Sequence, residues 1–328
     1  MSGILQAVNF AGRFDKKLRK GEKIRVRSDY YTPGYIAVLT AHLKRISVSR
    51  EGLEFVDAKN AGYFSAMGLS KALWGLDDYD RPRIKEGYNY APLTHLDSRD
   101  AVDHATAKIN SCLRTMAAQS RADYRQSPGF KSLMDVVGEL HDNVWSHGMD
   151  RGFSAAQRRG GPKKGIIEFA LADTGLGFLG ELKGSGIARK YGIDTDQEAM
   201  NWCIQEGNSS KLDHMQDDGW GQSLPDDFVG SSPFGQSVPT IHQNNGNHHQ
   251  GLGLAKLISL AKTYEAELII VSGYAVLHLS RGRMRFAESR TSWKGVAISL
   301  TLQESKMATL QDAAPCAAVD DIMNLLRG

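Results

Sequence analysis

Two short stretches of the chain carry side chains that could bind or transform a small molecule. Glu139, Asn143 and His147 recur at every fourth position, so on a helix they form one polar row that can line a cleft. The tetrapeptide 251–254, Gly-Leu-Gly-Leu, is typical of a helix start where glycine lets backbone N–H groups approach a phosphate. Each stretch also has a structural interpretation, because glycines form turns and a helix can carry hydrogen-bonded polar groups.

A third stretch places an acidic side chain at the end of a strand-like run. Asp173 follows the apolar segment Ile166–Ala172 and is followed by Gly175 and Gly177. Aspartate and glycine are both turn formers, so this stretch alone predicts only a turn.

The elements that would hold these residues follow from hydrophobic periodicity. The segment Phe130–His147 has apolar residues at i, i+4, i+7 and i+11, which predicts a helix whose polar row runs beside its buried stripe. We expect loops at 158–165 and at 212–250, the second rich in Gly and Pro and without Lys or Arg. Other expected helices are Tyr35–Ile46, Ala61–Leu73, about Asp97–Ala122 and Ala255–Tyr264; expected strands are near Ile24 and Val26 and at Leu53–Val56, Ile166–Ala172, Leu268–Val271, Ala275–Leu279 and Val296–Leu302.

Taken together and in this order, the three stretches resemble the motifs of the GHKL ATPase superfamily, named for gyrase, a heat-shock chaperone, histidine kinases and the MutL mismatch-repair protein. The resemblance covers about residues 125–303, and the segment 201–211 is similar to the family's stretch between its second and third motifs. The short first motif, Glu139-xxx-Asn143-xxx-His147-Gly148, is most similar to stand-alone anti-sigma-factor kinases and related ATP-binding proteins.

The resemblance implies an α/β fold, namely a two-layer α/β sandwich with a mixed sheet. The patterns at 32–39, 66–69 and 90–96 look like a smaller STAS-like α/β domain, a module that binds proteins in partner-switching pathways; a structural cap for the ATPase is the alternative. The expected division is a basic segment 1–22, the STAS-like domain 23–100, the ATP-binding domain 101–303 and a tail 304–328 with a short amphipathic helix at Val319–Leu326.

The resemblance also implies a role for each motif residue. Glu139 would be the catalytic base facing the γ-phosphate, and Asn143 would hold Mg²⁺ through its amide oxygen, together with phosphates and water. Asp173 would accept a hydrogen bond from the adenine amino group, which favours ATP over GTP. The rest of the expected ATP-binding set, whose glycines would give room at the base, sugar and phosphates, is His147, Gly175, Gly177, Lys211, Gly251, Gly253 and Leu254.

Two departures from the family pattern concern nucleotide binding. Gly295-Val296 replaces the frequent Gly-Thr before the last strand, so a hydroxyl that would help to bind adenine through water is missing and weaker adenine binding is expected. The loop 212–250 has no cation, so a contact to the γ-phosphate must come from Lys211, Lys256 or a second chain. The histidines of this loop have no acidic or thiol ligands at a regular spacing, and we do not expect a metal there.

Composition limits the functional classes. The 328 residues contain no apolar run long enough to span a membrane, and three widely spaced cysteines argue against a disulfide framework, so we expect a cytoplasmic protein. Residues 1–50 carry a net charge of +8 within a total of +3, which leaves nucleic-acid binding open without favouring it.

These features predict a regulatory ATPase that binds Mg-ATP and hydrolyses it to drive closure of the loop 212–250 and partner switching. A protein partner would bind the STAS-like domain or the tail, and a homodimer stays open. Two alternatives remain: a protein serine/threonine kinase of the anti-sigma type, and a non-catalytic switch that binds ATP to present a protein-binding face. His95 and His104 lack the surroundings of a phosphoacceptor helix, which argues against an orthodox sensor histidine kinase.

Overall fold

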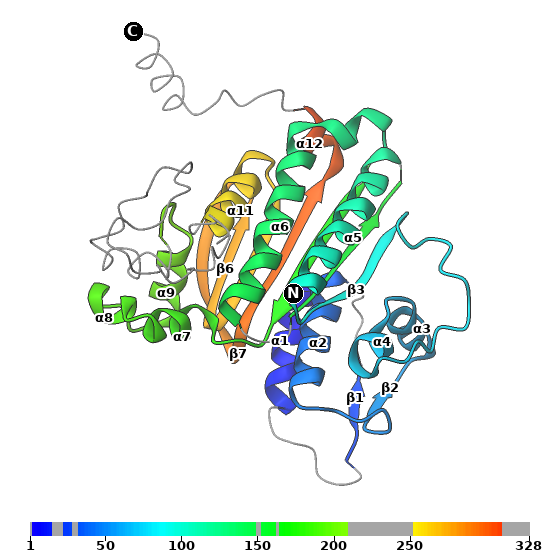
Figure 1. Cartoon of the computed structure of the whole chain (residues 1–328), viewed down its shortest axis with the longest axis horizontal. Coiled ribbons are helices and arrows are strands. Elements are labelled where there is room, and N and C mark those ends of the chain that lie inside the picture. Colours follow the sequence, from blue (N-terminus) through cyan, green and yellow to red (C-terminus); the bar gives the residue numbers. More distant parts are fainter. Residues whose placement is uncertain are drawn as a thin grey trace, which may run out of the picture.

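A five-stranded sheet with the strand order β3-β4-β5-β7-β6 lies at the centre of the structure (Figure 1). The computed structural model describes residues 2–14, 22–27, 32–148, 152–161, 164–208 and 252–309. Neighbouring strands in this sheet are all antiparallel, so the protein is of the α/β class but the expectation of a mixed sheet is wrong. The strands are β3 (Tyr90–Leu96), β4 (Gly152–Arg159), β5 (Ile166–Asp173), β6 (Glu267–Ser280) and β7 (Arg283–Gln303).

Three helices cover one face of the sheet (Figure 1): α5 (Arg99–Ala118), α6 (Pro128–Gly148) and α11 (Leu252–Thr263). The side chains of β5 alternate between the two faces, and Ile167, Phe169 and Leu171 join the apolar stripe of α6 in one buried cluster. The helices predicted from periodicity at 130–147 and 255–264 are therefore confirmed. In the parts of the chain that the structure describes, no helix has the length and apolar character needed to cross a bilayer.

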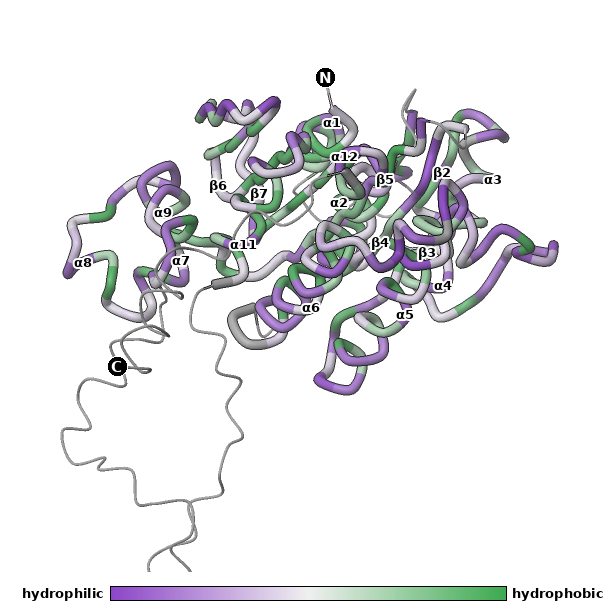
Figure 2. The backbone as a smooth tube through the Cα atoms, turned by 90° about the horizontal axis from the view of Figure 1, so that it is seen from above, coloured by the Kyte–Doolittle hydropathy of each residue, from purple (hydrophilic) through white to green (hydrophobic). Residues whose placement is uncertain are grey.

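Two helices from the beginning of the chain, α1 (Gly3–Ala11) and α2 (Pro33–Arg45), cover the opposite face. Ala170 and Ala172 of β5 belong to a second apolar cluster that includes residues of both helices. These small side chains let α2 lie close to the sheet, and α2 is buried from Pro33 to Leu43. In Figure 2, α1 lies on one side of the strands and α5 and α6 lie on the other. The structure therefore has three layers, and the expectation of a two-layer sandwich is wrong.

A buried carboxylate joins the N-terminal layer to the sheet. Glu168 of β5 points towards α2, and its Oε1 accepts hydrogen bonds from Gly34 N–H at 3.0 Å and from Ser299 Oγ at 3.2 Å. Gly34 lies in the first turn of α2, where the helix dipole favours a negative group. Burial nevertheless raises the pKa of Glu168. This side chain fixes the point at which α2 begins over the sheet.

The segment between α2 and the sheet forms a small α/β unit. β1 (Ile24–Val26) and β2 (Leu53–Phe55) make a parallel pair, and α3 (Ala58–Ala66) and α4 (Leu69–Trp74) follow it. The two predicted strands are confirmed, but the helix expected over Ala61–Leu73 is interrupted at Gly68, whose φ of 80° ends α3. β3 precedes the boundary expected near residue 100 and pairs with β4 beyond it, so residues from both sides of that boundary build one sheet.

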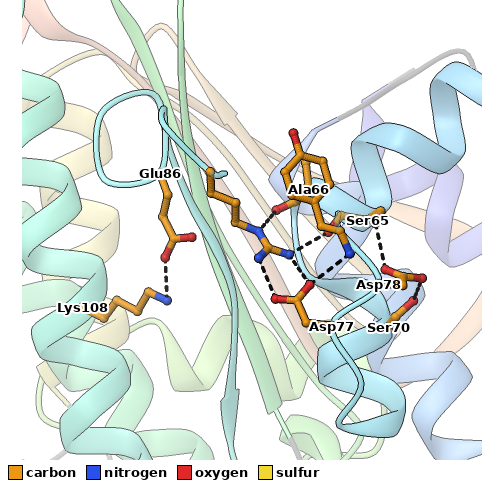
Figure 3. Close-up of polar contacts among 9 residues, drawn as sticks. Ser65, Ala66, Ser70, Asp77, Asp78, Glu86 and Lys108 are labelled. Carbon is orange, nitrogen blue, oxygen red and sulfur yellow. Dashed lines mark hydrogen bonds and ion pairs between the residues drawn. The ribbon is translucent and has the colours of Figure 1, made fainter. Parts of the chain in front are cut away.

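Charged and polar side chains hold the irregular segment 76–89 that links α4 to β3 (Figure 3). Arg83 contacts both carboxylate oxygens of Asp77 at 2.6 Å and donates to the carbonyl oxygens of Ser65 and Ala66 at the end of α3. Hydrogen bonding from Arg83 lowers the pKa of Asp77 to about 2. A guanidinium at a helix C-terminus also complements the helix dipole, so this pair orders a stretch that has little apolar character.

Strand β4 was not predicted, because it lacks the alternation of a half-buried strand. Phe153 and Ala155 belong to the cluster beneath α1 and α2, Ala156 belongs to the cluster beneath α6, and the strand pairs on both edges. Arg158, expected in a loop, lies in this strand and forms a buried ion pair with Glu304, with 2.6 Å between Nε and Oε1. Glu304 begins α12 (Glu304–Thr309), so this pair ties the end of the described chain to the sheet.

β6 and β7 include the three short strands expected in this part of the chain, and β6 folds back on itself. Glu267 and His278 form an ion pair of 3.4 Å although eleven residues of extended strand would separate them by about 36 Å. The register is irregular on both sides of Gly273, whose φ is 58°. The reversal therefore occurs at this glycine.

The remaining described elements are short. Between β5 and β6 lie α7 (Gly177–Gly184), α8 (Ile187–Tyr191) and α9 (Asp196–Cys203), which share a small apolar cluster. Thr195 and Glu198 form a capping box that fixes the start of α9. The 3₁₀ turns are η1 (Gly12–Phe14) and η2 (Ala122–Gln126). The helix expected at Val319–Leu326 lies outside the described residues.

His141 on α6 makes stability depend on pH. Its Nδ1 lies 2.8 Å from Thr106 Oγ1, and complete burial lowers its pKa to about 3. In the unfolded chain this histidine is protonated below about pH 6.5, whereas in the folded protein it stays neutral down to about pH 3. Stability that is present above about pH 6.5 is therefore lost as the pH falls towards 3. From this group we expect the free energy of unfolding to be lower by about 2 kcal/mol at pH 5 than at pH 7.

Urea denaturation of the parent and of His141→Gln at both pH values checks this expectation. Glutamine keeps a hydrogen-bonding partner for Thr106 but does not titrate. The variant should lose clearly less stability between pH 7 and pH 5 than the parent does. Equal losses in the two proteins would show that His141 is not the group responsible.

Candidate functional site

The polar row of α6 meets the first turn of α11. Glu139 and Asn143 lie one turn apart on α6, and Glu139 is buried. A Cβ atom on Gly253 would lie 3.1 Å from both Asn143 Nδ2 and Glu139 Cβ, so the glycine lets the two helices approach closely. His147 also belongs to α6, but its side chain lies outside the described part of the structure. The fold thus brings together two motifs that are about a hundred residues apart.

Asp173 is held at the end of β5 by backbone donors. Its Oδ1 accepts hydrogen bonds from the N–H groups of Gly175 at 2.9 Å and of Val296 at 3.3 Å. Two fixed donors to one oxygen restrict the orientation of this buried carboxylate. Val296 lacks a side-chain hydroxyl, but its backbone N–H still contacts Asp173, and any residue other than proline could make this contact.

Two glycines allow the backbone to come close at this point. Gly295 has φ 105°, and a Cβ atom there would lie 2.3 Å from the carbonyl oxygen of Asp173 and 2.6 Å from its Oδ1. Gly177 has φ 67°, and its Cβ atom would lie 2.8 Å from Ser272 Oγ, which accepts a hydrogen bond from Phe178 N–H. Both positions require glycine for conformation and for space.

A cavity of about 130 Å³ opens beside Asp173, between α6, α7, α9, the first turn of α11 and the strands β5 and β7. Four of the predicted site residues line it: Asn143, Asp173, Gly177 and Leu254. Most of the other lining side chains are apolar, and among them are Leu140, Val144, Leu171, Phe178, Leu182 and Trp202. The cavity therefore has a mainly apolar wall that carries two amides, Asn143 and Asn208, and two carboxylates, Asp173 and Glu181.

The other predicted residues divide into two groups. Glu139, Gly175 and Gly253 adjoin lining residues but are not part of the lining itself. Lys211 and Gly251, with the loop 212–250, lie outside the described residues. Apart from Gly177 at the start of α7, the wall residues of α7 and α9 were not predicted, and the only signal for α9 was the family resemblance of the segment 201–211.

A lysine forms an ion pair with Glu139. The Nζ atom of Lys256 on α11 lies 2.6 Å from Glu139 Oε1. The carboxylate side chain is 8% exposed, whereas the lysine side chain is 46% exposed. The negative charge of Glu139 is thus balanced by a cation that reaches it from the solvent side of α11.

Cys203 brings a thiol to the cavity wall. Burial, together with the nearby charge of Glu181, which also lines the cavity, raises the pKa of this thiol to about 12. The thiol is therefore protonated at neutral pH, and the thiolate is the nucleophilic form. Cys203 contributes to the wall and is not suited to nucleophilic catalysis.

Within the described ranges, no group of three or more His, Cys, Asp or Glu side chains is placed to hold a metal ion. A divalent cation at this cavity would need Asn143 together with oxygens from a bound molecule and water. An amide oxygen, phosphate oxygens and water are ligands that suit Mg²⁺, which usually takes few ligands from protein.

Comparison of the chain with protein-family models, with curated proteins and with solved structures gave no match.

We expect Gly295→Ala to disrupt both the fold near Asp173 and ligand binding in the cavity. The matched control is Gly282→Ala, because Gly282 also has a positive φ, 73°, but a Cβ atom there meets nothing within 4 Å. The control should cost about 1–2 kcal/mol of stability from backbone conformation alone. Gly295→Ala should cost about 1–3 kcal/mol more, because its Cβ atom collides with backbone. Thermal denaturation of the two variants measures the difference, and equal melting temperatures would contradict the close approach.

Proposed function

We propose that the protein binds Mg-ATP in this cavity and hydrolyses it, as a regulatory ATPase of the GHKL type. The observation that carries the proposal is the buried Asp173 carboxylate, anchored through one oxygen on the wall of an apolar cavity that also contains Asn143. An apolar slot with few oriented polar groups suits a flat heterocycle, because stacking area and a specific hydrogen bond are both available. The order of the three sequence motifs supports the same assignment.

The adenine base would occupy the cavity. Sites that enclose a whole drug-sized ligand have volumes of about 300–1,000 Å³. The smaller cavity of about 130 Å³ suits the base, with the sugar and phosphates extending outside it. Asp173 would accept a hydrogen bond from the adenine amino group, and guanine presents a carbonyl oxygen at that place, which a carboxylate repels.

The phosphates would extend towards the meeting point of α6 and α11. Asn143 would hold Mg²⁺ through its amide oxygen, and bound Mg²⁺ would neutralise phosphate charge. Glu139, one turn away, would orient or deprotonate the attacking water. Gly253 would give the phosphates access to backbone N–H groups at the start of α11.

One observation favours the second candidate, a non-catalytic switch gated by ATP. Lys256 Nζ lies 2.6 Å from Glu139 Oε1 in this structure, so this carboxylate oxygen is occupied by the lysine and does not face an attacking water. Transfer of phosphate to a protein serine or threonine uses the same residues and differs only in the acceptor. A partner protein would then bind the STAS-like N-terminal region or the tail 304–328.

Titration calorimetry with ATP and GTP tests nucleotide binding. The parent should bind ATP in the presence of Mg²⁺ and should bind GTP more weakly. Asp173→Asn keeps one acceptor oxygen for the backbone donors but loses the charge, and should weaken ATP binding by about tenfold or more, the scale of one charged hydrogen bond. Asp135→Asn, on the exposed side of α6, is the control and should bind like the parent. A folded parent protein that ignores millimolar ATP would exclude the proposal.

Replacement of Glu139 and replacement of Asn143 should affect different properties, hydrolysis in the first case and Mg²⁺-dependent binding in the second. Glu139→Gln should bind ATP at least as strongly as the parent does and lower hydrolysis by about a hundredfold, the scale of losing a positioned base. Asn143→Ala should lose the strengthening of ATP binding by Mg²⁺, because the metal would link protein and phosphates. Phosphate release and calorimetry with and without Mg²⁺ measure the two effects. Hydrolysis by Glu139→Gln at the parental rate, or no hydrolysis by the parent, would favour the ATP-gated switch.

A further inference from the structure

Lys256 lies where the polar row of α6 meets α11. It follows Gly253, where an added Cβ atom would lie 3.1 Å from both Glu139 Cβ and Asn143 Nδ2, and Leu254, which lines the cavity. Its ammonium group lies 2.6 Å from Glu139 Oε1. The cation is therefore next to the carboxylate proposed as the base, and that carboxylate is one helical turn from the amide proposed to hold Mg²⁺.

We propose that Lys256 is an exchange residue: it pairs with Glu139 when no terminal phosphate is near, and it leaves Glu139 to bind the terminal phosphate of a nucleoside triphosphate. This inference rests on the proposed function and adds a specificity-determining residue to it. Lys256 distinguishes a triphosphate from a monophosphate and makes release of Glu139 depend on that distinction.

The electrostatics of the pair support an exchange. A phosphate group placed beside the unneutralised Glu139 carboxylate would be repelled, most strongly where water is partly excluded. A single ammonium between the two anions removes this repulsion and has three donors with which to contact either of them. The cation is thus required at this place when a triphosphate binds.

The difference in exposure indicates which partner moves. The Glu139 side chain is 8% exposed and is packed where α6 and α11 approach, so it has little room to reorient. The Lys256 side chain is 46% exposed and has a flexible four-carbon stem. Its ammonium group can therefore change position by rotamer changes alone, without disturbing the packing of α11. Nucleotide binding would therefore displace the lysine head and leave the carboxylate in place.

A purely structural ion pair predicts a different behaviour. Breaking such a pair from either side removes the same charge–charge contact, and the two variants should then be damaged in the same direction. In an exchange, loss of the lysine removes a phosphate contact, whereas loss of the carboxylate charge frees the lysine for the phosphate. The two variants should then change triphosphate binding in opposite directions.

The test measures the dissociation constants of Mg-ATP and AMP by titration calorimetry. The quantity compared is the dissociation constant of AMP divided by that of Mg-ATP, which is large when the protein prefers the triphosphate. Lys256→Met should lower this ratio by about tenfold and leave AMP binding unchanged. Glu139→Gln should raise the ratio. Lys262→Met is the matched control, because Lys262 is exposed on the same helix in its last turn, and it should leave both constants unchanged.

The double variant Glu139→Gln/Lys256→Met, which has neither charge of the pair, is the control for a change in folding stability caused by an unbalanced charge. Its ratio should be lower than that of Glu139→Gln alone, whatever Lys256→Met does to folding. The inference is overturned if Lys256→Met leaves the ratio unchanged, or weakens ATP and AMP equally. A parent protein that binds neither nucleotide overturns the proposed function, and this inference with it. Binding with an unchanged ratio overturns only the role of Lys256.

Discussion

The contact between the end of β5 and the backbone at Gly295 is the constraint on which the site depends. A side chain at Gly295 would overlap the carbonyl oxygen of Asp173, so β7 reaches this position only because the residue is glycine. The same approach brings the N–H of Val296 to the Asp173 carboxylate. Without it the carboxylate would lose a fixed donor, and the cavity would lose part of its wall, since Val296 lines it. Backbone packing thus orients the one buried acid of the cavity wall.

The sequence predicted the parts of this site that lie on regular elements. The spacing of Glu139 and Asn143 placed them one turn apart beside a buried stripe, and the structure has them so. The role of Gly295 could not be predicted, because a close approach between two strands depends on tertiary packing and leaves no local pattern. Trp202 was missed as a wall residue for the same reason: α9 reaches the cavity only through its packing on α7 and β6.

The sheet explains which elements were missed. An inner strand that is covered on both faces shows no alternation, so Phe153 and the alanines of β4 did not indicate a strand. Ala155 of β4, with Ala170 and Ala172 of β5, makes room for α2, and Glu168 then binds the first turn of that helix. Residues predicted to precede the ATP-binding domain therefore supply a helical layer over the sheet that carries the site, and also its strand β3. A partner that bound α1 or α2 would act on the strands beneath them directly.

A crystal structure with Mg²⁺ and a non-hydrolysable ATP analogue is the most direct test of nucleotide binding at this site. We expect the adenine in the cavity, with its amino group donating to the Asp173 carboxylate and the metal on Asn143. We also expect the ammonium of Lys256 on the terminal phosphate and no longer on Glu139. An analogue bound elsewhere, or a cavity filled by a group that does not contact Asp173, would rule out this binding mode.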